Sequence, residues 1–343
     1  MMRLHLSWLL AFTTAALALL LLGSLATGPM TLTLGESLRA LFAGQESGIE
    51  SHKLLIVQEI RLPRTLLCIA VGGILGLCGA VMQGLFRNPL ADPGIIGVSG
   101  GAALGAALAI VLLAPLGQQL QATIGVGLLP LLAFLGGALT TTLVYLLGTR
   151  EGGTSVTVML LAGVAITALS GAVIGLLTYL ADDQMLRNLS LWQMGTLAAG
   201  KPADVALALL TLAALLWLFM RDANPLNALL LGEGEARHLG VNVQSLKRRL
   251  ILLTAAGVGV AVAVSGMIGF VGLVVPHLVR LLAGPNHVRL LPLSALLGAA
   301  LLLAADMLAR TLLAPAELPV GIITALLGAP FFIWLLVKGR RAL

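Results

Sequence analysis

The sequence predicts an all-α polytopic membrane protein with about ten transmembrane helices. Three observations carry this prediction. The 343 residues are 59% hydrophobic and only 10% charged, with a mean hydropathy of +1.06, which leaves too few charges to cover a water-soluble core of this size. Many apolar runs approach the length of about 20 residues that a helix needs to cross a bilayer. The runs do not alternate with polar residues at a period of two, which excludes a transmembrane barrel.

Charged or Pro/Gly-rich breaks divide the chain into ten predicted spans within a single transmembrane domain, residues 1–343. The predicted spans are 8–27, 62–83, 93–113, 123–147, 157–180, 202–220, 250–267, 270–283, 290–309 and 319–337. The first apolar run, Trp8 to Ala26, is also compatible with a cleaved signal peptide, but it is longer than a usual signal core and favours a retained span.

The charges predict the orientation of the spans. Ten spans place both termini on one side, and thirteen of the twenty Lys and Arg residues then fall on that side, while most carboxylates fall on the other. Because short cytoplasmic loops carry an excess of Lys and Arg, both termini are predicted to be cytoplasmic. In a bacterium this is the inner membrane. The positive net charge therefore reflects orientation and gives no reason to expect a nucleic-acid partner.

Small residues punctuate the spans, which predicts close packing of helices, because helices in lipid associate through small faces. The segment "VGGILGLCGA" is one example. The two cysteines, Cys68 and Cys78, lie ten residues apart on different faces of one predicted helix. We expect them to be unpaired packing residues.

The chemistry of a self-powered transporter or an enzyme is missing from the sequence. The chain has no G-x-x-x-x-G-K-[ST] loop, and its five histidines form no pair at a spacing of four, so neither ATP binding nor a metal site is predicted. Ionisable residues deep in a membrane usually mark function. Here Asp306 and Arg310 are four residues apart on one helix, which predicts a local ion pair rather than a proton relay. An intramembrane enzyme would need converging polar residues, which are not evident.

One charged segment, residues 221–249, interrupts the apolar chain on its cytoplasmic side. Its centre predicts a short helix with Glu233 and Glu235 in the first turn, a basic C-terminal end and Gly240 as the capping glycine. A link between spans needs only a few residues, and this one has many more. A docking helix for a partner is therefore favoured over an exposed structural loop.

Several motifs together resemble one family, the permease subunits of the type II ABC importers that take up iron chelates, haem and vitamin B12. The resemblance covers nearly the whole chain. Its motifs are "RLPR" at 61–64, "GAVMQGLFRNPLADPGIIGVSGGAALGA" at 79–106, "LLAGVA" at 160–165, "LWQMGTL" at 191–197, "LGEGEARHLGV" at 231–241, "SGMIGFVGLVVPHLVRLLAG" at 265–284, "LLPLSALLGAALLLAADMLAR" at 290–310 and "ELPVGIITALLGAPFFIWLL" at 317–336.

The resemblance implies a homodimer of ten-span subunits in which spans two to five and seven to ten form inverted repeats. It also implies two cytoplasmic ATPase subunits, which use ATP-Mg, and a periplasmic substrate-binding protein. This chain would bind no cofactor and no metal and would catalyse no reaction.

The resemblance assigns roles to residues at three places. ATPase coupling falls on Gly232, Glu233, Glu235, Ala236, Arg237, Leu239 and Gly240. Docking of the binding protein falls on Arg61, Arg64 and Arg310. Gating falls on Asn88, Leu90, Val156 and Thr157, although Val156-Thr157 departs from the Thr-Ser pair of the B12 importer at this position.

The cargo is predicted from the resemblance of two sequence segments more than from the chemistry of individual residues. The segments "LGEGEARHLGV" and "LARTLLAPAELPVG" look most like those of bacterial haem importers, with a ferric siderophore or cobalamin as alternatives. Arg187 is a candidate in the substrate path, because a guanidinium suits haem propionates, but an ion pair with Asp182 or Asp183 is an equal alternative. The alternative of another class is a stand-alone secondary transporter or channel.

Overall fold

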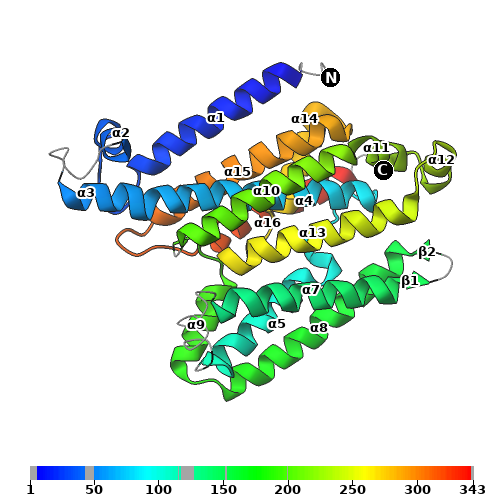
Figure 1. The fold of residues 1–343 in the computed structure, drawn as a ribbon, viewed down its shortest axis with the longest axis horizontal. Helices are drawn as coiled ribbons and strands as arrows, with labels where there is room; N and C mark the ends of the chain where they lie inside the picture. Colours follow the sequence, from blue (N-terminus) through cyan, green and yellow to red (C-terminus); the bar gives the residue numbers. More distant parts are fainter. Residues whose placement is uncertain are drawn as a thin grey trace.

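The computed structural model describes residues 6–42, 50–114, 116, 127–150, 153–198 and 200–340. Within these ranges seven helices are long and apolar enough to cross a membrane, and three further apolar helices are shorter. Together they form an elongated bundle (Figure 1). They are α1 (Leu6–Ala26), α4 (Leu62–Leu85), α5 (Val98–Val111), α7 (Leu128–Gly148), α8 (Val156–Leu180), α10 (Pro202–Arg221), α13 (Val243–Ser265), α14 (Val271–Ala283), α15 (His287–Thr311) and α16 (Val320–Arg340).

Each predicted span coincides with one of these helices, which confirms the all-α polytopic fold. The boundaries differ where a helix is broken or extended. The third predicted span begins with a separate 3₁₀ turn, Pro93–Ile96, and Gly97 (φ +84°) lies between this turn and α5. The seventh begins earlier than predicted, because α13 extends into the charged segment. Residues 123–126 of the fourth span lie outside the described residues.

Short elements cover the two ends of the bundle (Figure 1). One end, at the left, carries α2 (Leu34–Phe42), α3 (Ser51–Leu55) and α9 (Asp183–Gln193). The other end carries α11 (Ala223–Leu230), α12 (Glu233–His238) and the hairpin of β1 (Thr149–Arg150) and β2 (Gly153–Thr154). Helix α1 begins and α16 ends at this second end, so both lie on the side of the charged segment.

The two halves of the bundle repeat one pattern in opposite directions. Helix α4 is followed by a break and by α5, which has 14 residues; α13 is followed by a break and by α14, which has 13. Two longer helices complete each half, α7 and α8 in the first and α15 and α16 in the second. Figure 1 shows α4 and α13 running toward opposite ends of the bundle. This arrangement is the inverted repeat that the family resemblance implies.

Helix α4 is the centre of the fold, and contacts α10, α13, α14 and α15. Its small residues permit backbone contact: a Cβ on Gly72 would lie 2.4 Å from the carbonyl oxygen of Gly298, and one on Gly298 would lie 2.3 Å from that of Gly72. Cys68 and Cys78 on the same helix are buried and free, as expected. Small residues therefore act as packing surfaces here, in agreement with the sequence analysis.

Candidate functional sites

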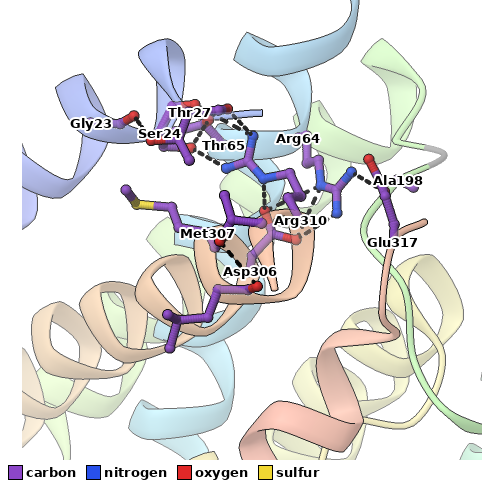
Figure 2. Close-up of polar contacts among 12 residues, drawn as sticks. Gly23, Ser24, Thr27, Arg64, Thr65, Ala198, Asp306, Met307, Arg310 and Glu317 are labelled. Atoms are coloured by element: carbon purple, nitrogen blue, oxygen red, sulfur yellow. Dashed lines mark hydrogen bonds and ion pairs between the residues drawn. The ribbon is translucent and has the colours of Figure 1, made fainter. Parts of the chain in front are cut away.

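A buried cluster of charged residues lies at the α2/α3 end of the bundle, and is called the arginine cluster (Figure 2). Figure 2 shows four of its members, Arg64, Asp306, Arg310 and Glu317, and the fifth is Arg61, which binds the end of α1. Asp306 is fully buried and is shared by two arginines. Its Oδ1 lies 2.9 Å from Nη2 of Arg64, and its Oδ2 lies 3.0 Å from Nε of Arg310. The predicted ion pair between Asp306 and Arg310 is confirmed, with Arg64 as a third member from a distant part of the chain.

Further hydrogen bonds connect the cluster to nearby chain segments. Arg64 Nη1 donates to Glu317 Oε2 at 2.7 Å. Arg310 Nη2 donates to Ser24 Oγ at 2.7 Å, which joins α15 to α1. Arg61 Nη1 donates to the carbonyl oxygens of Leu25 and Ala26 at 2.7 and 2.8 Å. The cluster therefore fastens α1, α4, α15 and the segment before α16 to one another. It also shows that the first apolar segment is built into the bundle.

These contacts bear on the three arginines that the family resemblance assigns to docking. Arg61, Arg64 and Arg310 do lie together at one end of the bundle, as predicted, but they are only 3%, 6% and 2% exposed. Asp306 and Glu317 pair with Arg64 and Arg310, whereas Arg61 donates to backbone carbonyl oxygens, so the cluster has one positive charge in excess. Their docking role stays a prediction, and in this conformation it would require Arg64 to exchange Glu317 for a carboxylate of the partner.

An exposed network beside this cluster fixes the start of α2. Glu36 accepts from the backbone N–H of Thr33 at 2.8 Å and from Lys53 Nζ at 2.9 Å. The Thr33 amide, followed by the hydrogen bond from Lys53, lowers the pKa of Glu36 from 4.5 to about 2. The carboxylate thus favours the folded state above pH 4.5, and this contribution is lost as the pH falls toward 2.

The predicted coupling helix exists as α12, and its caps agree with the sequence analysis. Gly232, at φ +123°, precedes the helix, and Glu233 and Glu235 occupy its first turn. Gly240, at φ +83°, follows the C-cap Leu239; its N–H donates to Arg237 O, while the N–H of Val241 donates to Ala236 O. This pair of hydrogen bonds is a Schellman cap. The capped helix is a defined element, not an irregular loop.

The side chains of α12 divide into an anchored and an exposed set. Ala236 is buried in the main core, whereas Glu235, Arg237 and Leu239 are exposed. The exposed fraction of Leu239 is 64%. The exposed set therefore combines charged side chains with one leucine, and its role in docking a partner stays a prediction.

Two polar networks attach the charged segment to the bundle. The carbonyl oxygen of the Asn227 side chain accepts from the backbone N–H of His287 at 2.8 Å, which joins α11 to α15. Lys247 on α13 is 2% exposed, and its Nζ lies 2.6 Å from Glu233 Oε1 on α12. The segment is therefore held on two sides.

The predicted gate residues lie on two neighbouring elements. Asn88 and Leu90 belong to the connection after α4, where Asn88 Oδ1 accepts from Leu90 N at 2.9 Å. Val156 and Thr157 form the first turn of α8. The 3₁₀ turn after Leu90 touches α8: a Cβ on Gly163 would lie 1.9 Å from Ile95 O. The structure thus places a contact between the turn that follows Leu90 and the helix that begins at Val156, and the role of the four predicted gate residues stays a prediction.

Arg187 is exposed on α9 at the α2/α3 end of the bundle. Among the described residues it forms no ion pair with Asp182 or Asp183; Asp182 instead caps α9 by accepting from Met185 N at 2.8 Å. The alternative of a local ion pair is therefore not supported. Arg187 remains a candidate for the substrate path.

Sequence reasoning identified only part of the role of three charged residues of these sites. Asp306 was predicted only as a partner of Arg310, Glu317 was not assigned a role beyond its outside location, and Lys247 was counted only as a cytoplasmic charge. The three ion pairs that were not predicted are Arg64–Asp306, Arg64–Glu317 and Lys247–Glu233, and each joins residues on different segments of the chain. Lys247 precedes the predicted span at 250–267, so its position in the sequence carries no signal of burial; only the extension of α13 to Val243 places it inside a helix.

The comparisons with known proteins agree on one family. Residues 16–338 match the FecCD transport family. The hemin transport system permease protein HmuU of Yersinia pestis is 47% identical to this chain over 97% of it and 96% of the relative. The vitamin B12 import system permease protein BtuC of Shigella boydii is 42% identical over 99% of this chain and 97% of the relative.

Solved structures agree with this result. An inward-facing conformation of a metal-chelate type ABC transporter superposes with a TM-score of 0.82 at 34% identity, covering 97% of this chain and all of the other. A second structure, PsaBC from Streptococcus pneumoniae in complex with Fab, has a TM-score of 0.58 at 20% identity and supports the fold alone.

Proposed function

The chain belongs to the FecCD transport family, and from this premise we propose that it is the permease subunit of a type II ABC importer that carries haem from the periplasm to the cytoplasm. The observation that carries the proposal is the 47% identity with a hemin permease across nearly the full length of both chains. The TM-score of 0.82 to a metal-chelate type ABC transporter supports the assignment to an ABC importer.

The energy for transport comes from a separate ATPase in this proposal. The sequence has no phosphate-binding loop of the G-x-x-x-x-G-K-[ST] kind. The homodimer would bind two ATPase subunits, which use ATP-Mg. Each ATPase subunit would bind the exposed face of α12 in one protomer. This chain would itself bind no cofactor and perform no covalent chemistry.

The exposed leucine of α12 provides a test of the ATPase contact. Replacing Leu239 by Asp would place a charge where the proposed interface needs an apolar contact. We expect the affinity for the ATPase subunit to fall about tenfold or more. Titration of the detergent-solubilised permease with labelled ATPase measures this. Leu312→Asp, at a leucine of similar exposure beyond the other end of the bundle, is the control, and equal binding by the two variants would contradict the assignment of α12.

Transport would proceed by alternating access between two conformations. Closure of the ATPases would displace α12, and the segments at Asn88–Leu90 and Val156–Thr157 would open or close the path on the cytoplasmic side. The contact of Ile95 with α8 at Gly163 supports this assignment, because movement of α8 would alter the packing of the 3₁₀ turn that follows Leu90.

The homodimer and the orientation are parts of the same proposal. Helix α8 carries many exposed apolar side chains along its length, and so does the described part of α16. They provide an apolar surface for a second copy and for lipid. The excess of Lys and Arg on the side of α12 supports placing both termini in the cytoplasm of a bacterium, with the arginine cluster facing the periplasmic binding protein.

Uptake by proteoliposomes that contain the permease, its ATPase and its binding protein tests the cargo. Haem, a ferric siderophore and cobalamin are offered separately in the presence of ATP. We expect haem alone to accumulate. Accumulation of another chelate instead would retain the importer and overturn the haem assignment.

Arg187 is the residue to test once haem uptake is established. Replacing Arg187 by Ala would remove an exposed cation that attracts the propionates, and we expect the KM for haem to rise about two- to fivefold with little change in kcat. Arg39→Ala, at another exposed arginine of the same end, is the matched control. An unchanged KM for Arg187→Ala would remove this residue from the substrate path.

A further inference from the structure

A single buried lysine connects the proposed coupling helix to the hairpin that precedes α8. Lys247 lies on the second turn of α13, and its side chain is 3% exposed. Its Nζ lies 2.6 Å from Glu233 Oε1 on α12 and donates to the carbonyl oxygen of Thr154 on β2 at 3.0 Å. One ammonium group on α13 therefore contacts two other elements, α12 and β2.

A second residue of α13 strengthens the connection to the hairpin. Gln244 Oε1 accepts from the backbone N–H of Thr154 at 3.2 Å and from its hydroxyl at 3.0 Å. Both polar groups of the Thr154 backbone are thus fixed by side chains of α13. Thr154 is followed directly by Ser155, which caps α8 by accepting from Val158 N at 3.4 Å. The position of Thr154 consequently sets where α8 begins.

The contacts of Lys247 are costly to break because its ammonium group is buried. A buried ammonium group is stable only while its charge and its hydrogen-bond donors are matched, and separating it from one partner leaves an unpaired charge in the protein. When α12 is displaced, Lys247 keeps its contacts only if α13 and β2 move together with Glu233. The alternative, rupture of the contacts, is unfavourable. Displacement of α12 is therefore carried to the first turn of α8.

From this geometry we infer that Lys247 is a positioning residue that transmits the movement of α12 to α8, with Gln244 as a second contact between α13 and Thr154. The inference rests on the proposed function, because it assumes that α12 receives the ATPase and that α8 begins at a gate. It adds the route between them, which runs from Glu233 through Lys247 and Thr154 to Val156. The residue acts through its neighbours and touches neither ATP nor cargo.

The coupling of ATP hydrolysis to transport can be measured in proteoliposomes that contain the permease, the ATPase and the binding protein. The measured quantity is the number of cargo molecules accumulated per ATP hydrolysed. We expect Lys247→Met to lower that ratio about tenfold, because hydrolysis continues while its effect on α8 is lost. Gln244→Met is expected to lower it in the same direction by a smaller factor, and Lys247→Arg, which keeps a charged donor, to restore most of it. Arg248→Met is the matched control: it removes the same charge one residue away, from an exposed side chain, and leaves the ratio unchanged.

The outcomes separate the inference from the function on which it rests. If the wild-type protein accumulates cargo with ATP and Lys247→Met keeps the wild-type ratio, Lys247 does not transmit movement. If Lys247→Met and Gln244→Met lose hydrolysis and ATPase binding in proportion to uptake, the residues are only structural, and the inference also fails. If the wild-type protein shows no ATP-dependent uptake, the proposed function itself is wrong. Should Lys247→Met not reach the membrane, Gln244→Met and Lys247→Arg decide by the same ratio.

Discussion

Replacement of Asp306 by Asn is expected to lower the free energy of unfolding by about 3–5 kcal/mol, the cost of removing one partner from a buried ion pair. Asp306 is fully buried and is the only carboxylate in contact with both Arg64 and Arg310 among the described residues. Asn has nearly the same shape, so the change removes the charge and leaves the packing intact. Two guanidinium groups would then remain at 6% and 2% exposure with Glu317 as the nearest carboxylate.

Unfolding of the purified permease in detergent, followed by circular dichroism, measures this loss. Glu317→Gln is the matched control, since Glu317 contacts one arginine and its side chain is 35% exposed. We expect that variant to lose less than about 1 kcal/mol, as partly exposed pairs do. Equal stability of Asp306→Asn and the wild type would show that the arginine cluster does not hold α1, α4 and α15 together.

Replacement of Gly72 by Val is expected to destabilise the protein by about 3 kcal/mol, near the upper end for added atoms in a packed core. The added Cβ would lie 2.4 Å from Gly298 O and 2.8 Å from Leu302 Cβ, closer than atoms can approach. The obstacle is the backbone of α15, which cannot rotate away as a side chain could. Helices α4 and α15 would have to separate along their length.

The same unfolding measurement tests this prediction. Gly35→Val in α2 is the control, because a Cβ at Gly35 meets nothing within 4 Å. Its expected effect is below about 0.5 kcal/mol, as for most surface substitutions. A change at Gly72 no larger than the change at Gly35 would contradict the close contact of α4 with α15.

The spans could be predicted from the sequence because hydropathy alone determines which segments lie in lipid. Where the predicted boundaries were wrong, local geometry decided them. The third span starts with a separate 3₁₀ turn because Gly97 takes a positive φ between that turn and α5. Helix α13 begins seven residues before its predicted start, because Asn242 caps it by accepting from Ser245 N. Helix α9 was not predicted as an element, since its polar residues carry no hydropathy signal.

The candidate sites could be predicted only in their local parts. The caps of α12 follow from Glu233, Glu235 and Gly240, which are close together in the sequence, and the structure confirms them. The pair of Asp306 with Arg310 has helical spacing and was predicted for the same reason. The contact of Asp306 with Arg64 spans 242 residues, and no spacing rule predicts it. Burial of the three arginines likewise depends on tertiary packing.

The most direct test of the whole account is the accumulation of haem in proteoliposomes with and without ATP and the ATPase partner. If the chain is a permease powered through α12, haem accumulates only when the permease, the binding protein, the ATPase and hydrolysable ATP are all present. Uptake at the same rate without ATP or without the ATPase would contradict the account. The chain would then be a stand-alone transporter or channel, and α12 would have no role in supplying its energy.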